Sequence, residues 1–425
     1  CKACEEELTD KKNRRYRYPL ISCKSCGPRY TIMEDVPYDR IRTVMREFEL
    51  CDECKKDYER FGDTRRYAQT IACKKCGPKV KLFFRKGSEK NIYIAEGDEA
   101  INKTIDIIKN GGISAVKGIG GYHLCFDAKN RDAAIRLRKL KNRRSKPFAV
   151  MFKDLSEIKK YACLTKKEEE ILTSYIRPIV LLDKADKTSD PAEKLADEVT
   201  SFSNKIGAML ACNPIQILIL NECHPLVMTS ANISGEPIIT DDKLILSLLN
   251  EGICDAVLMH ERKILNGLDD SIYQVVNTYG ESDDDGRVFI IRRARGLVPE
   301  PILLDEAFNE TTFAAGSDLK AVFGIGRGNG AYLSGHFGDL SSKRANDNRK
   351  ESIENMSGLL GIKKEDIKRA VTDAHPGYIS SRDLYIDPNE GSIKKIYHHH
   401  AHIASVMAEK GLKGKEIGRA SCRER

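Results

Sequence analysis

Eight cysteines near the N-terminus are the feature that most constrains the fold of this chain. They form four Cys-x-x-Cys pairs, with 18 residues between the two pairs of each unit, and the whole unit recurs with a period of 50 residues. The first unit contains Cys1, Cys4, Cys23 and Cys26, and the second contains Cys51, Cys54, Cys73 and Cys76. Four thiolates at this spacing suit a closed, tetrahedral, structural zinc site. Each 50-residue unit has few large apolar side chains, so metal binding must supply much of its folding free energy. The pattern predicts two structural Zn²⁺ ions, with iron–sulfur ligation as the alternative.

The two units share more than their cysteines. Gly-Pro follows the second pair in each, and an Arg-Arg-Tyr triplet precedes that pair at Arg14 to Tyr16 and at Arg65 to Tyr67. Zinc ribbons occur in nucleic-acid-binding proteins and in enzymes, so this region alone does not assign a function. Basic residues outnumber acidic ones over residues 1–80, which suits a solvated face, compensation of thiolate charge, or a phosphate-binding surface.

The composition and the cysteine spacing argue against a membrane-spanning protein and against a disulfide-rich secreted domain. The 425 residues are 41% hydrophobic with a net charge of +8, and no apolar run approaches the length of a membrane helix. Paired metal-type cysteines indicate a reducing compartment, and we expect the cytoplasm. The other six cysteines have no nearby partner and are expected to be core residues or incidental thiols: Cys125, Cys163, Cys212, Cys223, Cys254 and Cys422.

From about residue 92 the pattern becomes that of an alternating α/β domain. Apolar residues at helical spacing, including Ile101 and Ile108, precede a short predicted strand over residues 113–116. The loop Lys117-Gly-Ile-Gly-Gly121 follows, where amides and one lysine could meet an anion, although such loops are commoner than phosphate sites. A further helix is predicted to begin near Asn130.

That second helix ends in a dense group of cations. These cations repel one another, so such a group is tolerable where an anion of high charge density binds. Cations at a helix C-terminus are also ordinary, because they interact favourably with its carbonyl groups. The cations are Arg138, Lys139, Lys141, Arg143, Arg144 and Lys146. Further along, a predicted buried strand over residues 225–228 runs into Thr229-Ser230-Ala231-Asn232, which could be a ligand-binding strand end or a plain turn.

Several segments of this region resemble a known family. Lys117-Gly-Ile-Gly-Gly-Tyr-His-Leu, Lys141-x-Arg143 with Lys146-Pro147, and Thr229 to Asn232 resemble the YrdC-like fold, which condenses a carbamoyl-type acid with ATP. With the zinc ribbons upstream, four more segments resemble the carbamoyltransferases that mature NiFe-hydrogenases, the HypF family. These are Lys146 to Met151, Arg177 to Leu182, Asp269 to Ser271 and Arg292 to Gly296. Residues 211–216 depart from the family pattern, and no site residue is assigned there.

The resemblance implies roles for particular residues. Lys141, Arg143 and Lys146 are expected to stabilise the charge that develops on the α-phosphate of ATP·Mg²⁺. Ser230 and Asn232 are expected to hold the nucleotide or carbamoyl group. Further phosphate contacts are expected from Lys117, Arg292, Arg293 and Arg295.

The C-terminal part resembles the Kae1-like, actin-like domain of the same carbamoyltransferases. The similar segments are Phe313 to Lys320, Ala331 to Leu340, Asp373 to Tyr378 and His398 to His402. On a helix, His398 and His402 share a face and could bind one further metal ion, Fe or Zn. The alternatives are a surface histidine cluster and a purification tag.

We therefore expect a multidomain α/β chain that is a fragment lacking the family's N-terminal acylphosphatase domain and most of its Kae1-like domain. The expected parts are a paired zinc-ribbon domain over residues 1–80, a YrdC-like carbamoyl-adenylate-forming domain over 92–300, the N-terminal part of a Kae1-like domain over 311–416, and a non-native tail over 417–425.

The resemblance implies that the whole enzyme adenylates carbamate derived from carbamoyl phosphate. It then passes the carbamoyl group to the C-terminal cysteine of a maturation partner of the HypE family, for the cyanide ligands of NiFe-hydrogenase. The alternatives are a threonylcarbamoyl-adenylate synthase of tRNA modification, a small-molecule O-carbamoyltransferase and a zinc-ribbon nucleic-acid-binding protein. Neither a membrane nor a nucleic acid is expected as a partner.

Overall fold

A computed structural model describes residues 1–85, 92–143, 145–185, 194–201, 203–232, 235–276, 286–386 and 391–414. The backbone forms two compact units. Unit 1 comprises Cys1–Ser234 and Ile238–Gly296, and unit 2 comprises Gly235–Pro237 and Leu297–Arg425. No described helix combines the length and apolar character that crossing a bilayer requires.

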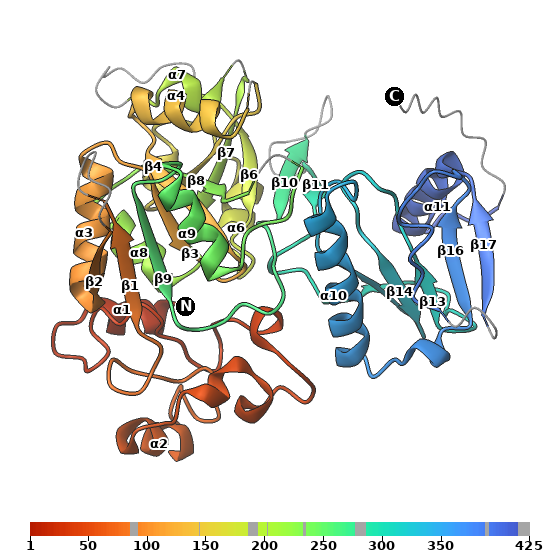
Figure 1. The fold of residues 1–425 in the computed structure, drawn as a ribbon, viewed down its shortest axis with the longest axis horizontal. Coiled ribbons are helices and arrows are strands. Elements are labelled where there is room, and N and C mark those ends of the chain that lie inside the picture. The colour runs from red at the N-terminus through yellow and green to blue at the C-terminus, as the bar shows by residue number, and fades with distance from the viewer. Residues whose placement is uncertain are drawn as a thin grey trace. The chain divides into compact units, whose positions relative to one another are not determined.

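The first 80 residues of unit 1 contain little regular structure (Figure 1). Each repeat begins with one short helix that carries the second cysteine of its first pair, and both of these cysteines are buried. The elements are α1 (Lys2–Thr9), α2 (Asp52–Glu59) and the 3₁₀ turns η1 (Tyr30–Ile32), η2 (Arg40–Arg42) and η3 (Val44–Glu47). The buried cluster of the second repeat is small, with Ala68 and Ile71 beside two of the cysteines. So small a core agrees with a second repeat that needs metal to fold. The buried apolar side chains of the first repeat instead belong to a larger cluster that they share with the sheet of unit 1 and α3 (Gly97–Lys109).

The rest of unit 1 is built on a mixed sheet of eleven strands within the described residues. The strand order is β11-β10-β6-β7-β5-β8-β4-β3-β9-β1-β2. The strands are β1 (Val80–Phe84), β2 (Tyr93–Glu96), β3 (Ser114–Lys117), β4 (Tyr122–Asp127), β5 (Ala149–Phe152), β6 (Ile179–Asp183), β7 (Lys205–Leu210), β8 (Leu226–Ser230), β9 (Ala256–His260), β10 (Ile272–Val276) and β11 (Arg287–Arg292).

The remaining helices of unit 1 surround this sheet (Figure 1). They are α3 (Gly97–Lys109), α4 (Arg131–Leu140), α5 (Leu155–Ile158), α6 (Lys166–Thr173), α7 (Asp197–Thr200), α8 (Pro214–Leu220) and α9 (Asp242–Asn250). Helix α3 buries Ile101 and Ile108 completely, as their helical spacing predicts. Helix α4 begins where the sequence indicates, because the Asn130 side chain accepts a hydrogen bond from the amide of Ala133 at 2.9 Å.

Residues 211–216, which depart from the family pattern, lead into α8 and form its first turn. The Asn213 side chain accepts a hydrogen bond from the Gln216 amide at 3.0 Å, and Pro214 occupies the first helical position. Asn and Pro are favoured in these places because they satisfy or remove amides that a helix start leaves unpaired. The segment therefore has a local structural purpose.

Among its described residues, unit 2 contains a six-stranded sheet in the order β12-β15-β14-β13-β16-β17. Strands β13 to β15 pair antiparallel in sequence, and β16 and β17 extend the sheet in parallel. The strands are β12 (Ile302–Leu303), β13 (Thr312–Ala314), β14 (Gly324–Arg327), β15 (Gly330–Leu333), β16 (Arg369–Asp373) and β17 (Ser392–Ile396). The helices are α10 (Lys343–Leu359), the 3₁₀ turn η5 (Lys364–Asp366) and α11 (His398–Lys410).

Candidate functional site

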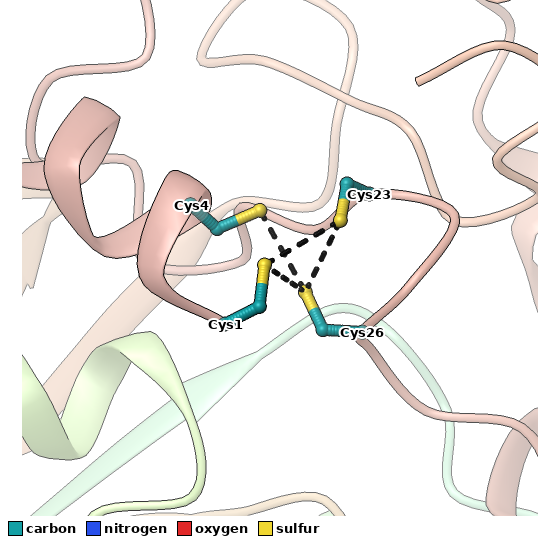
Figure 2. Close-up of side chains that lie close together, drawn as sticks. All are labelled: Cys1, Cys4, Cys23 and Cys26. Carbon is teal, nitrogen blue, oxygen red and sulfur yellow. Dashed lines mark hydrogen bonds between the residues drawn. The ribbon is translucent and has the colours of Figure 1, made fainter. Parts of the chain in front are cut away.

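The first four-cysteine set, which we call centre A, brings Cys1, Cys4, Cys23 and Cys26 together (Figure 2). Its Sγ–Sγ distances are 3.5 Å for Cys1–Cys23, 3.6 Å for Cys1–Cys26, 3.7 Å for Cys23–Cys26 and 3.6 Å for Cys4–Cys26. A disulfide would bring two of these atoms to about 2.05 Å. Four ligands about 2.3 Å from a tetrahedral zinc ion lie about 3.8 Å from one another. Centre A therefore fits a metal ion held by four thiolates.

The second set, centre B, repeats this geometry with Cys51, Cys54, Cys73 and Cys76. Its Sγ–Sγ distances are 3.8 Å for both Cys51–Cys73 and Cys73–Cys76. In each centre all four sulfurs lie within 4.8 Å of one another. All four ligands come from the protein, which is typical of a structural metal site.

A third cluster joins the end of α4 to the end of β8. Lys141 is the C-terminal capping residue of α4, and its Nζ donates to the carbonyl of Ser230 at 2.5 Å and to Oδ1 of Asn232 at 3.3 Å. Ser230 Oγ also donates to Asn232 Oδ1, at 2.7 Å. Lys141 is thus in direct contact with two other predicted site residues, Ser230 and Asn232, that lie about ninety positions further along the sequence.

Arg143 lies beside this cluster and holds the turn that leads into β5. Its Nε donates to the carbonyl of Lys146 at 3.0 Å, and its Nη1 donates to Thr229 Oγ1 at 3.2 Å. The guanidinium also lies over the Phe148 ring, 4.7 Å from the centroid. Arg143 therefore positions the turn as well as adding positive charge.

Burial and mutual repulsion lower the pKa values of Lys141 and Arg143. Burial lowers the pKa of Lys141 to about 7, with further lowering by Arg143 and Lys146 and partial compensation by Asp269. Burial, Arg138 and Arg292 together lower the pKa of Arg143 to about 10. An anion at this place would relieve the repulsion and favour the charged forms.

Three further cations predicted at this site are less buried than Lys141. Lys146 is exposed. Arg144 lies outside the described residues. Arg292 is half-buried, with its Nη1 3.8 Å from Asp269, and Arg293 is also half-buried. Their roles at a phosphate remain predictions.

Lys117 and Arg295 are buried in ion pairs. Lys117 Nζ donates to Asp242 Oδ1 at 2.7 Å and to the His260 carbonyl at 3.0 Å. Arg295 Nε donates to Asp270 at 2.8 Å, and its terminal nitrogens donate to the carbonyls of residues 176 and 177. Such contacts suit structural residues, and both side chains are more than nine-tenths buried. Their roles as phosphate contacts remain untested predictions.

Sequence reasoning did not assign three polar residues that take part in these clusters. Thr229 accepts from Arg143, Asp269 faces Arg292, and Asp270 accepts from both Arg295 and His123, the latter at 3.1 Å. Arg295 and His123 hold the pKa of Asp270 well below its usual value, against the raising effect of burial. The adjacent pair Asp269-Asp270 was the available signal.

In unit 2, His398 and His402 lie one turn apart on α11, and their Nε2 atoms are 3.1 Å apart. His398 Nδ1 donates to Asp373 Oδ2 at 2.9 Å, which leaves Nε2 as the metal-binding nitrogen. The pair lines a cavity of about 460 Å³ together with Lys320 and Ser405. The two nitrogens are close enough to bind one ion, as their helical spacing predicts. Asp373 is a further residue that the sequence did not assign.

Comparison with known proteins gives three family matches in chain order. The family described as HypF finger matches residues 1–33 and 50–83. The Sua5, YciO and YrdC family, described as telomere recombination, matches residues 106–293. The family described as HypF Kae1-like domain matches residues 307–409.

Whole-chain relatives agree with these matches. The chain is 39% identical over 413 residues to carbamoyltransferase HypF of Synechocystis sp., covering 97% of this chain and 51% of that protein. It is 36% identical over 431 residues to carbamoyltransferase HypF of Rhizobium leguminosarum bv. viciae, covering 99% and 51%. A crystal structure of full-length HypF in the phosphate- and nucleotide-bound form superposes with a TM-score of 0.86 at 39% identity, covering 97% and 51%.

The fold and these matches define the class as modular proteins that join a cysteine finger region, a domain of the Sua5, YciO and YrdC family and a Kae1-like domain. The chain belongs to the HypF family of that class. This confirms the family and the fold class inferred from the sequence. The chain spans about half the length of the curated relatives it matches.

Proposed function

We propose that unit 1 catalyses the adenylation of carbamate, as one step of a carbamoyltransferase that acts in NiFe-hydrogenase maturation. A carbamate oxygen attacks the α-phosphorus of ATP, the bond to the β-phosphate oxygen breaks, and carbamoyl adenylate and pyrophosphate form. Carbamoyl phosphate is the proposed source of carbamate. The observation that carries this proposal is the contact of buried Lys141 with Ser230 and Asn232 at the end of β8.

Roles follow from the contacts. Lys141 is the proposed electrostatic catalyst, since a buried ammonium interacts strongly with charge that develops on phosphate. Ser230 and Asn232 would orient the nucleotide or the carbamoyl group, and Arg143 would hold the turn and add positive charge. The phosphate- and nucleotide-bound form of a similar HypF supports a nucleotide site in this class of protein.

The metal proposed for centres A and B is Zn²⁺, in a structural role. A further ion, Fe or Zn, is proposed at His398 and His402, with Asp373 orienting the first histidine. The Kae1-like region would serve the later transfer of the carbamoyl group to the C-terminal cysteine of a HypE-family partner.

The test is carbamate-dependent exchange of pyrophosphate into ATP. Lys141→Ala should lower the exchange rate by about 100-fold or more, the size of effect seen when one preorganised donor to a transition state is removed. Lys139→Ala is the matched control, because Lys139 lies on the same helix and is exposed. Unchanged exchange in Lys141→Ala would refute the assigned role. Exchange that requires bicarbonate plus threonine would instead indicate a threonylcarbamoyl-adenylate synthase.

A further inference from the structure

The two cysteine repeats are related residue by residue with an offset of 50. Arg17 and Tyr67 share a left-handed backbone, with φ of 53° and 55°. The amides of Arg15 and Arg65 each donate to the side-chain oxygen two residues earlier, at 2.9 and 2.8 Å. The Arg-Arg-Tyr triplets are 51 residues apart, so Arg15, and not Arg14, is the structural equivalent of Arg65.

Arg65 belongs to the second repeat but contacts the metal centre of the first. Its Nη1 donates to Glu7 Oε1 at 2.6 Å, and its Nη2 donates to the Sγ of Cys4 at 3.8 Å. The arginine side chain is only 4% exposed. Glu7 lies on α1, the same helix that carries Cys4.

Arg15 makes the reciprocal contacts from the first repeat. Its Nη2 donates to Asp57 Oδ2 at 2.8 Å and to the Sγ of Cys54 at 3.7 Å. Asp57 lies on α2 with Cys54, as Glu7 lies on α1. The preceding Arg14 adds two further donations to Cys54 Sγ, both at 3.4 Å. Each repeat thus extends arginine to the second cysteine of the other repeat.

The charge balance explains why such contacts matter. A divalent ion with four thiolates carries a net charge of about −2, and a buried site of that charge is stabilised by donors and cations around its ligands. Cys54 is fully buried, and Cys4 is 4% exposed. For both sulfurs, arginine donors come from the opposite copy.

We propose that Arg15 and Arg65 are outer-shell positioning residues of the metal centre in the opposite repeat, so that centres A and B load metal cooperatively. When centre B is empty, the second repeat loses its folding energy, Arg65 is no longer held at Cys4, and centre A binds metal more weakly. By reciprocity, centre A changes the affinity of centre B by the same factor. Loss of an outer-shell partner typically costs 10–100-fold in affinity, and we expect about tenfold here.

The experiment measures metal protection of each cysteine in the whole chain. After loading with two Zn²⁺ per chain, a competing chelator and iodoacetamide are added, and alkylation is followed by peptide mass spectrometry. Arg65→Gln should accelerate alkylation of the centre A cysteines about tenfold, more than those of its own repeat. Arg15→Gln should do the reverse and expose centre B first.

Control variants distinguish an effect on the metal centre of the opposite repeat from a structural disturbance of the repeat that carries the variant. Arg66→Gln is the matched control, because Arg66 stacks on Phe61 and Tyr67 within its own repeat and should not produce the crossed pattern. Arg65→Lys, which keeps the charge but not the two-nitrogen fork, provides a milder variant if Arg65→Gln fails to fold. In addition, Cys51→Ser with Cys54→Ser should weaken Zn²⁺ at centre A about tenfold. Alkylation that rises first in the repeat carrying the arginine variant, or that is unchanged in both repeats, would overturn the proposal.

Discussion

At the scale of single residues, Lys141 shows how much of a site can be inferred from sequence. The cation-rich helix end and the Ser–Asn strand end were both visible as local patterns, and the family resemblance suggested that they meet. The depth of Lys141 could not be predicted, because its burial depends on packing between α4 and β8. That burial lowers its pKa to about 7.

The lowered pKa makes a pH prediction possible. A bound triphosphate favours the ammonium form and raises the pKa of Lys141, so ATP binding at pH 8 should take up close to one proton. Affinity for ATP should then fall as the pH rises above 7. Calorimetry in HEPES and in Tris buffers measures this uptake. Arg at position 141 stays protonated, so Lys141→Arg should abolish the buffer dependence, and equal uptake in both proteins would contradict the assignment.

At the scale of elements, the glycine-rich loop between β3 and β4 illustrates an ambiguity of sequence. Glycines mark both anion-binding loops and places where two backbones approach closely. A Cβ at Gly120 would lie 2.2 Å from the Leu268 carbonyl oxygen, and the loop closes on itself through a 2.8 Å bond from Gly118 N to Gly121 O. Close packing alone therefore explains the glycine at position 120.

Gly120→Ala should destabilise unit 1 by about 2–3 kcal/mol, because a backbone carbonyl cannot yield as a side chain can. Gly118→Ala is the control, since its nearest contact, the Gly121 carbonyl oxygen, would be 3.2 Å away. The urea midpoint followed by circular dichroism measures both. Equal midpoints for the two variants would show that close packing does not constrain this turn.

Helix α11 and strand β16 together make a second prediction at this scale. Asp373 at the end of β16 fixes His398, and such partners typically contribute 10–100-fold to metal affinity. Asp373→Asn should lower Zn²⁺ affinity at the histidine pair by that factor, and His402→Ala should remove binding. His400→Ala, on the same helix, should not change it. Chelator titration of protein whose centres A and B are already loaded measures this, and unchanged affinity in Asp373→Asn would exclude the positioning role.

At the scale of the whole molecule, the order of the parts was predictable and the sheet was not. Cysteine spacing and short motifs indicated zinc ribbons, then a YrdC-like part, then a Kae1-like part. The pairing of β9 with both β3 and β1 joins segments more than 140 residues apart, which no local periodicity encodes. The register of the two cysteine repeats could be predicted, because the 50-residue period of the cysteines already pairs Arg15 with Arg65.

Ligands should protect separate parts of the chain. Hydrogen exchange followed by mass spectrometry should show that ATP slows exchange in peptides covering residues 131–143 and 226–232, since binding stabilises the structure around its own site. Zn²⁺ added after centres A and B are full should slow exchange in residues 398–410. Protection by ATP confined to residues 312–410 would move the nucleotide site to unit 2.

The reciprocal arginines also bear on how a tandem repeat of this kind can change over time. A duplicated module is usually free to lose one copy or to be transplanted as a single piece. Here each repeat supplies an arginine that donates to a cysteine of the other repeat, so a single repeat would leave that thiolate without this donor. We therefore expect that removing one repeat would weaken the metal site of the repeat that remains.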